Sequence, residues 1–163
     1  MSENISKADL SEKYFKEGAN CAQAVLAAFA PELGIDVGLA MQLASGFGGG
    51  VGRMREVCGA FSGLVLIENL KNSSADHTDK EAKDSCYARI QMLAQLFKEQ
   101  SGGNSIICRE LLSGTRATSG GASEERTKEF YKKRPCVELV RIAAEIAEKE
   151  CFFEKNYKKP LEK

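Results

Sequence analysis

Histidine, tryptophan and proline are scarce in this sequence, and the scarcity excludes some kinds of chemistry. The 163 residues include one histidine, three prolines and no tryptophan. His77 lies in a polar stretch beside Asp76 and Asp79, which is typical of a solvated surface position. Cys–His or Ser–His catalysis and histidine-rich metal sites therefore have little to build on. The low proline content, together with frequent alanine, favours helices.

Net charge and long apolar runs are also absent. The 23 acidic and 23 basic residues give a formal net charge of zero, so no strong field draws the chain to nucleic acid or to an anionic membrane surface. The most apolar stretches, residues 19–31 and 60–67, are shorter than the roughly 18 residues of a spanning helix. The N-terminal stretch is polar and lacks the apolar core of an export signal. We expect a cytoplasmic protein that binds neither nucleic acid nor membrane.

Helical periodicity is the main structural signal in the sequence, and no segment alternates with the period of a strand. Residues 79–100 carry the cleanest apolar stripe. Residues 21–29 and 55–70 are apolar nearly all round, which predicts burial. A short charged helix is expected over residues 124–133, and a last one over 135–151. The pattern predicts an all-α bundle of about seven helices.

The chain is long enough to form one hydrophobic core of its own. We expect a single α-helical domain over residues 1–163. Its core should span about residues 6–152, and residues 153–163 should form a frayed tail.

Six cysteines are many for a chain in a reducing compartment, where they favour metal binding, catalysis or redox sensing over structural disulfides. None belongs to a CxxC motif, and the nearest pair, Cys136 and Cys151, is fifteen residues apart. A zinc finger, a zinc ribbon and a thioredoxin-type motif are thereby excluded. Any cysteine site must be assembled by the fold from distant positions.

Four of the six cysteines lie in or near the opening turn of an expected helix: Cys21, Cys58, Cys108 and Cys136. Free backbone N–H groups and the helix dipole favour negative charge there. A thiol at such a place is biased toward thiolate, which is the form that attacks disulfides and binds metals. Basic residues also stand near three of the four in sequence: Arg53 and Arg55 before Cys58, Arg109 after Cys108, and Arg134 before Cys136.

The other two cysteines, Cys86 and Cys151, continue apolar helix stripes. Cys86 aligns with Ile90 and Leu93, and Cys151 follows Ala147 at helical spacing. Both are interpreted as small buried side chains. Burial raises the pKa of a thiol, so both should be inert.

A glycine-rich loop precedes the helix that bears Cys58, with five glycines among residues 46–52. Such a loop can offer backbone N–H groups to an anion or a cluster, or it can form a tight crossing that needs positive φ. The sequence leaves both open, although a GxGxxG dinucleotide motif is excluded by the spacing. Gly59 and Gly63, four residues apart, predict close approach of another helix near Cys58. The candidate cofactor-binding residues are Gly48, Gly49, Gly50, Gly52, Arg53 and Gly59.

At Cys58 the run CGAFSG fits the pattern CGAxxG. With Cys21 before it, and Cys108 and Cys136 after it, the chain resembles the C_GCAxxG_C_C family of proteins described as redox-active. The similarity extends from about residue 18 to residue 148. It includes NCAQAV, SGFGGGVGRMREVCGAFSG, CRELL and RPCVELVRIAAEI. The resemblance implies redox chemistry at the four cysteines, with a bound group such as an iron–sulfur cluster, and it implies no particular substrate.

Three functions are compatible with these patterns. In the first and favoured one, the four cysteines bind zinc or an iron–sulfur cluster and exchange electrons with a redox partner protein. In the second, the site is metal-free, and Cys21 pairs with Cys58 while Cys108 pairs with Cys136 in thiol–disulfide exchange. In the third, the chain is a non-catalytic helical binding or scaffold module whose cysteines only pack.

Overall fold

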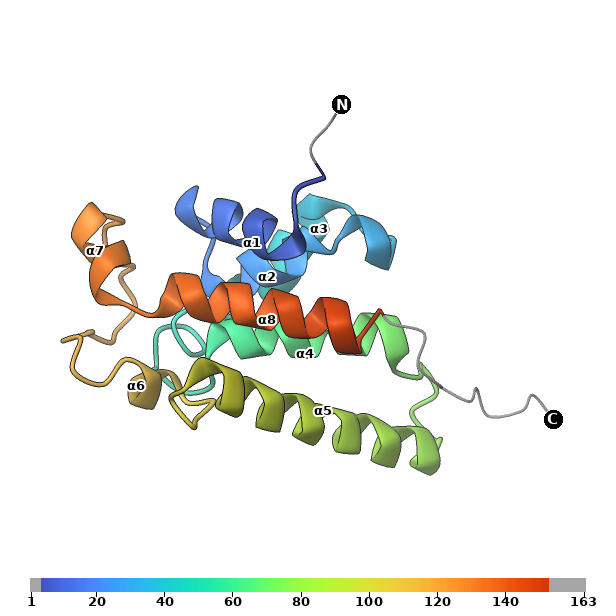
Figure 1. Ribbon diagram of the computed structural model, residues 1–163. Coiled ribbons are helices and arrows are strands. Elements are labelled where there is room, and N and C mark those ends of the chain that lie inside the picture. Colours follow the sequence, from blue (N-terminus) through green and yellow to red (C-terminus); the bar gives the residue numbers. More distant parts are fainter. Residues whose placement is uncertain (1–3, 153–163) are drawn as a thin grey trace.

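The computed structural model describes residues 4–152, and the regular elements in this range are helical (Figure 1). The α-helices are α1 Lys7–Lys16, α2 Cys21–Ala28, α3 Val37–Ala44, α4 Gly59–Asn72, α5 Lys80–Ser101, α6 Cys108–Leu111, α7 Lys128–Lys133 and α8 Cys136–Glu150. Two 3-10 turns, η1 Pro31–Leu33 and η2 Ser45–Phe47, flank α3. The predicted all-α fold of about seven helices is confirmed. The tail expected to fray, residues 153–163, lies outside the described residues.

Polar side chains begin the helices where the sequence places them. Asn20 and Gln23 form a reciprocal capping box at the start of α2: the Gln23 N–H donates to Asn20 Oδ1 at 2.9 Å, and the Asn20 N–H donates to Gln23 Oε1 at 3.0 Å. Asp36 accepts from the Leu39 N–H at the start of α3. These bonds satisfy backbone donors that the first helical turn leaves unpaired.

Helix α8 lies at the centre of the bundle, between α1 and α5 and against α4 (Figure 1). Buried side chains from several helices meet there in one apolar cluster, among them Leu26, Leu64, Leu93, Phe97 and Val140. No helix among residues 4–152 combines the length and the apolar character needed to cross a bilayer.

Helices α2 and α4 pack closely because α4 carries glycine where they touch. A Cβ on Gly63 would lie 2.8 Å from Val25 Cβ, and one on Gly59 would lie 3.1 Å from Cys21 Cβ. The predicted close approach of a helix near Cys58 is therefore confirmed. The approaching helix is α2, which brings Cys21 to the start of α4.

Helix α4 begins later than residue 55, where the sequence placed its start. Arg55 has a φ of 59° and so cannot lie in a right-handed helix. The segment after it pairs with residues 106–108 instead: the Cys58 N–H donates to the Ile106 carbonyl at 2.7 Å, and the Cys108 N–H donates to the Glu56 carbonyl at 2.6 Å. This short antiparallel contact holds Cys58 and Cys108 on neighbouring segments.

The helix expected over residues 124–133 is also shorter than predicted. Helix α7 begins at Lys128, and Thr127 caps it by accepting from the Phe130 N–H. Glu124 and Arg126 are held in non-helical backbone by contacts with distant parts of the chain. Tertiary contacts outweigh the local helix signal here.

Candidate functional site

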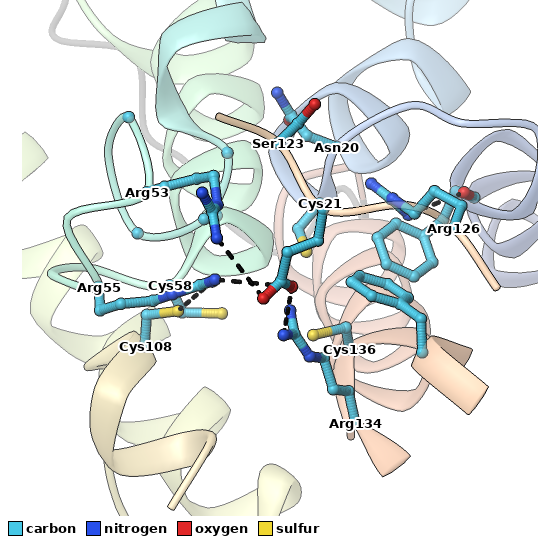
Figure 2. Close-up of a pocket in the computed structure, with 18 of the residues that line it drawn as sticks. Asn20, Cys21, Arg53, Arg55, Cys58, Cys108, Ser123, Arg126, Arg134 and Cys136 are labelled. Carbon is cyan, nitrogen blue, oxygen red and sulfur yellow. Dashed lines mark hydrogen bonds and ion pairs between the residues drawn. The ribbon is translucent and has the colours of Figure 1, made fainter. Parts of the chain in front are cut away.

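Four helix starts converge on one cavity. Cys21, Cys108 and Cys136 are the first residues of α2, α6 and α8, and Cys58 is the N-cap of α4. All four side chains line a cavity of about 300 Å³, in which three of them are buried and Cys21 is half-buried. Figure 2 shows the four sulfurs around this space. Residues up to 115 positions apart in the sequence therefore share one pocket.

The glycine loop forms one wall of the cavity through a left-handed turn. Residues 49–53 all have positive φ, between 55° and 71°. The N–H groups of residues 51–56 donate to carbonyls of residues 46–51. These bonds close the loop on itself, as a tight crossing requires.

Two glycines of this loop stand where any side chain would collide. A Cβ on Gly50 would lie 2.6 Å from Cys108 Cβ and 2.7 Å from the Glu56 nitrogen. A Cβ on Gly48 would lie 2.5 Å from Asn20 Cγ. The loop can therefore pass directly over α6 and the start of α2. The predicted cofactor-binding residues Gly48, Gly49, Gly50, Gly52, Arg53 and Gly59 all line the cavity.

Arginines give the cavity its charge. Four arginines and one carboxylate line it: Arg53, Arg55, Arg126, Arg134 and Glu124. The Glu124 carboxylate pairs with Arg53 at 3.5 Å, with Arg55 at 3.9 Å, and with Arg134 at close contact. Figure 2 shows these three arginines reaching the same place from different segments.

Residues 117–124, here called the strap, contribute Gly121, Ser123 and Glu124 to the lining of the cavity and are held by the same arginines. Arg53 Nη1 donates to the carbonyls of Gly120, at 2.8 Å, and Ala122. Arg55 Nε donates to the Thr118 carbonyl at 2.8 Å. Arg126, just after the strap, places its guanidinium 4.4 Å from the centre of the Phe15 ring. The strap thus depends on polar contacts with the residues that charge the cavity.

Cys21 and Cys136 line the same cavity, and their thiols have opposite pKa shifts. The interaction with Cys21 lowers the pKa of Cys136, and the nearby charges of Arg134, Arg126 and Arg55 lower it further against the effect of burial. The same interaction, together with burial, raises the pKa of Cys21. Cys136 is therefore the more acidic thiol of the two.

The other two cavity cysteines remain protonated. Burial raises the pKa of Cys58 to about 12, although the N–H groups of Phe61 and Ala60 act in the other direction. Burial also raises the pKa of Cys108, partly offset by Arg55, whose Nη1 lies 3.8 Å from Cys108 Sγ. The predicted bias of all four helix-start thiols toward thiolate is therefore wrong for Cys21, Cys58 and Cys108. Loss of hydration outweighs the helix start at Cys58 and Cys108, and at Cys21 the interaction with Cys136 adds to it as the larger cause.

Neighbours in the sequence were only a partial guide to the charged residues that lie near the cysteines in the fold. Arg109, next to Cys108 in sequence, is exposed and pairs with Glu56 at 2.8 Å. Arg126 had no signal in the sequence, and Glu124 looked like a helix-start residue. Both belong to a loop rich in small and polar residues, and only the fold brings them to the cysteines.

The cysteines of the cavity fit the two expected kinds of metal site unequally. Among residues 4–152, no group of three or more His, Cys, Asp or Glu side chains is placed to hold one metal ion. The described residues therefore offer no formed site for a single zinc ion. Four thiols lining one cavity are the donor set that iron–sulfur clusters use, and the surrounding arginines would offset the negative charge of such a group.

The comparisons with known proteins agree with the cysteine pattern. The family model described as "Putative redox-active protein (C_GCAxxG_C_C)" matches residues 19–150. The chain belongs to this family. Searches of curated proteins and of solved structures found no match. The family description supports redox activity without naming a substrate, a metal or a partner.

Proposed function

We propose that this protein is a thiol–disulfide redox protein in which Cys136 is the attacking thiolate and Cys21 the resolving thiol. The observation that carries the proposal is that these two cysteines line one cavity together with Arg126 and Arg134, whose charges lower the pKa of Cys136. A thiolate with a lowered pKa beside a second thiol is the arrangement that disulfide exchange requires. This pairing differs from the two pairings expected from the sequence.

The exchange conserves atoms and electrons. The Cys136 thiolate attacks one sulfur of a disulfide substrate, the substrate S–S bond breaks, and the leaving thiolate takes up a proton from solvent. The Cys21 thiol then loses its proton, and its sulfur attacks Cys136 Sγ. A Cys21–Cys136 disulfide forms and the second substrate thiol leaves. Two electrons pass from the protein to the substrate, and a cellular dithiol would return them.

The charges and thiols around Cys21 and Cys136 fit the roles of attacking and resolving thiol. Arg134, whose side chain is 10% exposed, places positive charge near the attacking sulfur in partly dehydrated surroundings, where charge interactions are strong. Cys58 and Cys108 stay protonated beside the pair, so they would not compete as nucleophiles at neutral pH. Their place in the same cavity makes them a second dithiol for later exchange.

The test is exchange with a neutral disulfide followed by mass spectrometry of the linkage. Fully reduced protein treated with 2-hydroxyethyl disulfide should lose two free thiols and gain a Cys21–Cys136 link that dithiothreitol reverses. C151S is the matched control and should react like the wild type. Absence of a reversible link between Cys21 and Cys136 would remove the basis of the proposal and favour cysteines that only pack.

An iron–sulfur site is the second candidate, and the gathering of four thiols around one cavity favours it. Cys21, Cys58, Cys108 and Cys136 would be the ligands, and the bound group would supply one-electron transfer to a redox partner protein. Protein purified without oxygen should then contain iron and sulfide in stoichiometric amounts and absorb visible light. Protein prepared in this way that contains no iron or sulfide, and whose Cys21, Cys58, Cys108 and Cys136 are all alkylated after unfolding, would exclude this candidate.

A further inference from the structure

The strongest unexplained feature of the cavity is the position of Glu124. Its carboxylate lies among three guanidinium groups, and it is the one acidic side chain in a lining that also holds four arginines. The mutual repulsion of these arginines would be costly without an anion between them. Glu124 therefore shows what kind of group the cavity holds, namely a carboxylate.

The segment that supplies this carboxylate is anchored mainly by polar contacts with arginines. Most strap residues are exposed and lack regular structure. Thr118 Oγ1 accepts from Arg53 Nη2 at 3.0 Å and donates to Glu124 Oε1 at 2.8 Å. These bonds use the same guanidinium groups that hold Glu124. A competing anion that took the arginines would therefore release the strap and Glu124 together.

The size of the cavity limits the competitor to a small molecule. About 300 Å³ is at the lower end of the range for small-ligand pockets. The same space is lined by Cys136 and by Arg134, which pairs with Glu124. A small molecule with a carboxylate on the arginines would thus lie beside the thiolate.

We propose that the cavity binds a low-molecular-weight disulfide that carries carboxylate groups, with one carboxylate replacing Glu124 on Arg53, Arg55 and Arg134. The proposal rests on the proposed disulfide exchange and names its substrate class. The strap then acts as an internal competitor: its Glu124 occupies the arginines until an anionic disulfide displaces it. The apparent affinity is reduced by the fraction of molecules in which Glu124 occupies the arginines.

The test compares three disulfides that differ in charge. Exchange rates with oxidised glutathione (anionic), 2-hydroxyethyl disulfide (neutral) and cystamine (cationic) are each divided by the rate of the same disulfide with a free small thiol. The wild type should prefer the anionic disulfide over the cationic one by about tenfold, since like charges are excluded and opposite charges concentrated in such a cavity. The preference should shrink as salt concentration rises.

Removal of the competing carboxylate separates substrate binding from general electrostatics. E124Q should raise the anionic-to-neutral rate ratio about fivefold. E125Q makes the same charge change on the neighbouring exposed residue and should leave the ratio within about twofold. T118V, which keeps Glu124 but removes the hydroxyl between it and Arg53, should raise the ratio to a smaller extent. T118V keeps the test decisive if E124Q folds poorly.

A binding experiment gives a readout that needs no exchange. S-methylglutathione keeps the carboxylates and cannot exchange, and calorimetry should show saturable binding to E124Q that is tighter than to E125Q. An unchanged rate ratio among wild type, E124Q and E125Q, or no saturable binding to E124Q, would overturn the inference. Failure of Cys136 to exchange with any of the three disulfides would instead overturn the proposed function, and the calorimetric result would still decide whether the cavity takes a carboxylate.

Discussion

The two ends of helix α8 each carry a cysteine, and the two thiols have opposite properties. Cys136 is the first residue of the helix and has a lowered pKa beside Cys21 and Arg134. Cys151 is the C-cap, and its pKa is raised by burial and then by a hydrogen bond with Glu68. The exposed fractions are similar, 8% and 4%. Burial raises the pKa of both thiols, so the partners of each thiol decide which one can react.

The region around Cys151 is a structural ion-pair site. Glu68, which is 2% exposed, accepts from Arg89 Nε at 2.9 Å and from Asn72 Nδ2 at 2.8 Å. Arg89 Nη2 also donates to the Glu150 carbonyl at 2.8 Å and so ties α5 to the end of α8. The prediction that Cys151 is buried is confirmed. Cys86 lies nearby but is half-buried, so its predicted burial is wrong: its Sγ lies 3.8 Å from Asn69 Oδ1.

The largest effect is expected from removing one of the two α8 cysteines. C136S should slow disulfide exchange about 100-fold or more, because the reaction loses its nucleophile. C151S should leave the rate within about twofold, because that thiol is protonated and buried. Stopped-flow measurement of thiol loss checks both variants. Equal rates in wild type and C136S would show that another cysteine starts the reaction.

A second contrast tests the glycine loop that shapes the cysteine end. G50A should lower the free energy of unfolding by about 2–4 kcal/mol, because positive φ is strained for alanine and the new Cβ would lie 2.6 Å from Cys108 Cβ. G52A has positive φ with open space around it, so about 1 kcal/mol is expected. Denaturant unfolding measures both. Similar losses for the two variants would contradict a close approach at Gly50.

At the Cys151 end of α8, protonation of Glu68 should lower the stability of the protein as the pH falls. Burial raises the pKa of this carboxyl, but the hydrogen bonds from Arg89, Cys151 and Asn72 outweigh it and lower the pKa below its ordinary value of 4.5. The stabilisation is therefore full above about pH 4.5 and is lost as pH falls through the folded-state pKa.

Substitution of Glu68 should remove this dependence. E68Q should lower the free energy of unfolding at neutral pH by about 2–3 kcal/mol, since Arg89 loses its partner but is itself partly exposed. Its unfolding free energy should also fall less steeply between about pH 5 and pH 3 than that of the wild type. Parallel pH profiles for the two proteins would contradict the role assigned to Glu68.

The smallest effect is expected from one charge at the start of α8. R134Q should slow alkylation of Cys136 at neutral pH about three- to tenfold, because a rise of one unit in pKa reduces the thiolate fraction tenfold. K133Q changes the same charge one residue earlier, on an exposed side chain, and should have little effect. An equal slowing in both variants would indicate general electrostatics rather than the specific contact.

Local signals in the sequence predicted the helices and the placement of four cysteines at helix starts. Caps such as Asn20, apolar periodicity and glycine spacing depend on neighbouring residues, so they can be read directly. The positive φ of Arg55 and the ion pairs of Glu124 depend on residues about 50 to 70 positions apart. No local pattern reports such contacts, and this is why the start of α4, the start of α7 and the charged part of the cavity were not predicted.

The pKa values of the thiols also depend on contacts that local sequence patterns do not report. Position at a helix start was a sound indicator for Cys136, but it failed for Cys58 because loss of hydration exceeds the benefit of two backbone N–H groups. Burial and partner identity must be known before a thiol can be assigned a charge.

Cysteine-resolved alkylation as a function of pH tests the central claim most directly. Reduced protein is pulsed with iodoacetamide between about pH 5 and pH 10, and the labelling of each cysteine is followed by mass spectrometry. The account predicts that Cys136 is labelled with a midpoint below that of free cysteine and below those of the other five thiols, while Cys151 remains unlabelled until the protein unfolds. A midpoint for Cys136 at or above that of free cysteine, or labelling of Cys151 before Cys136, would contradict it.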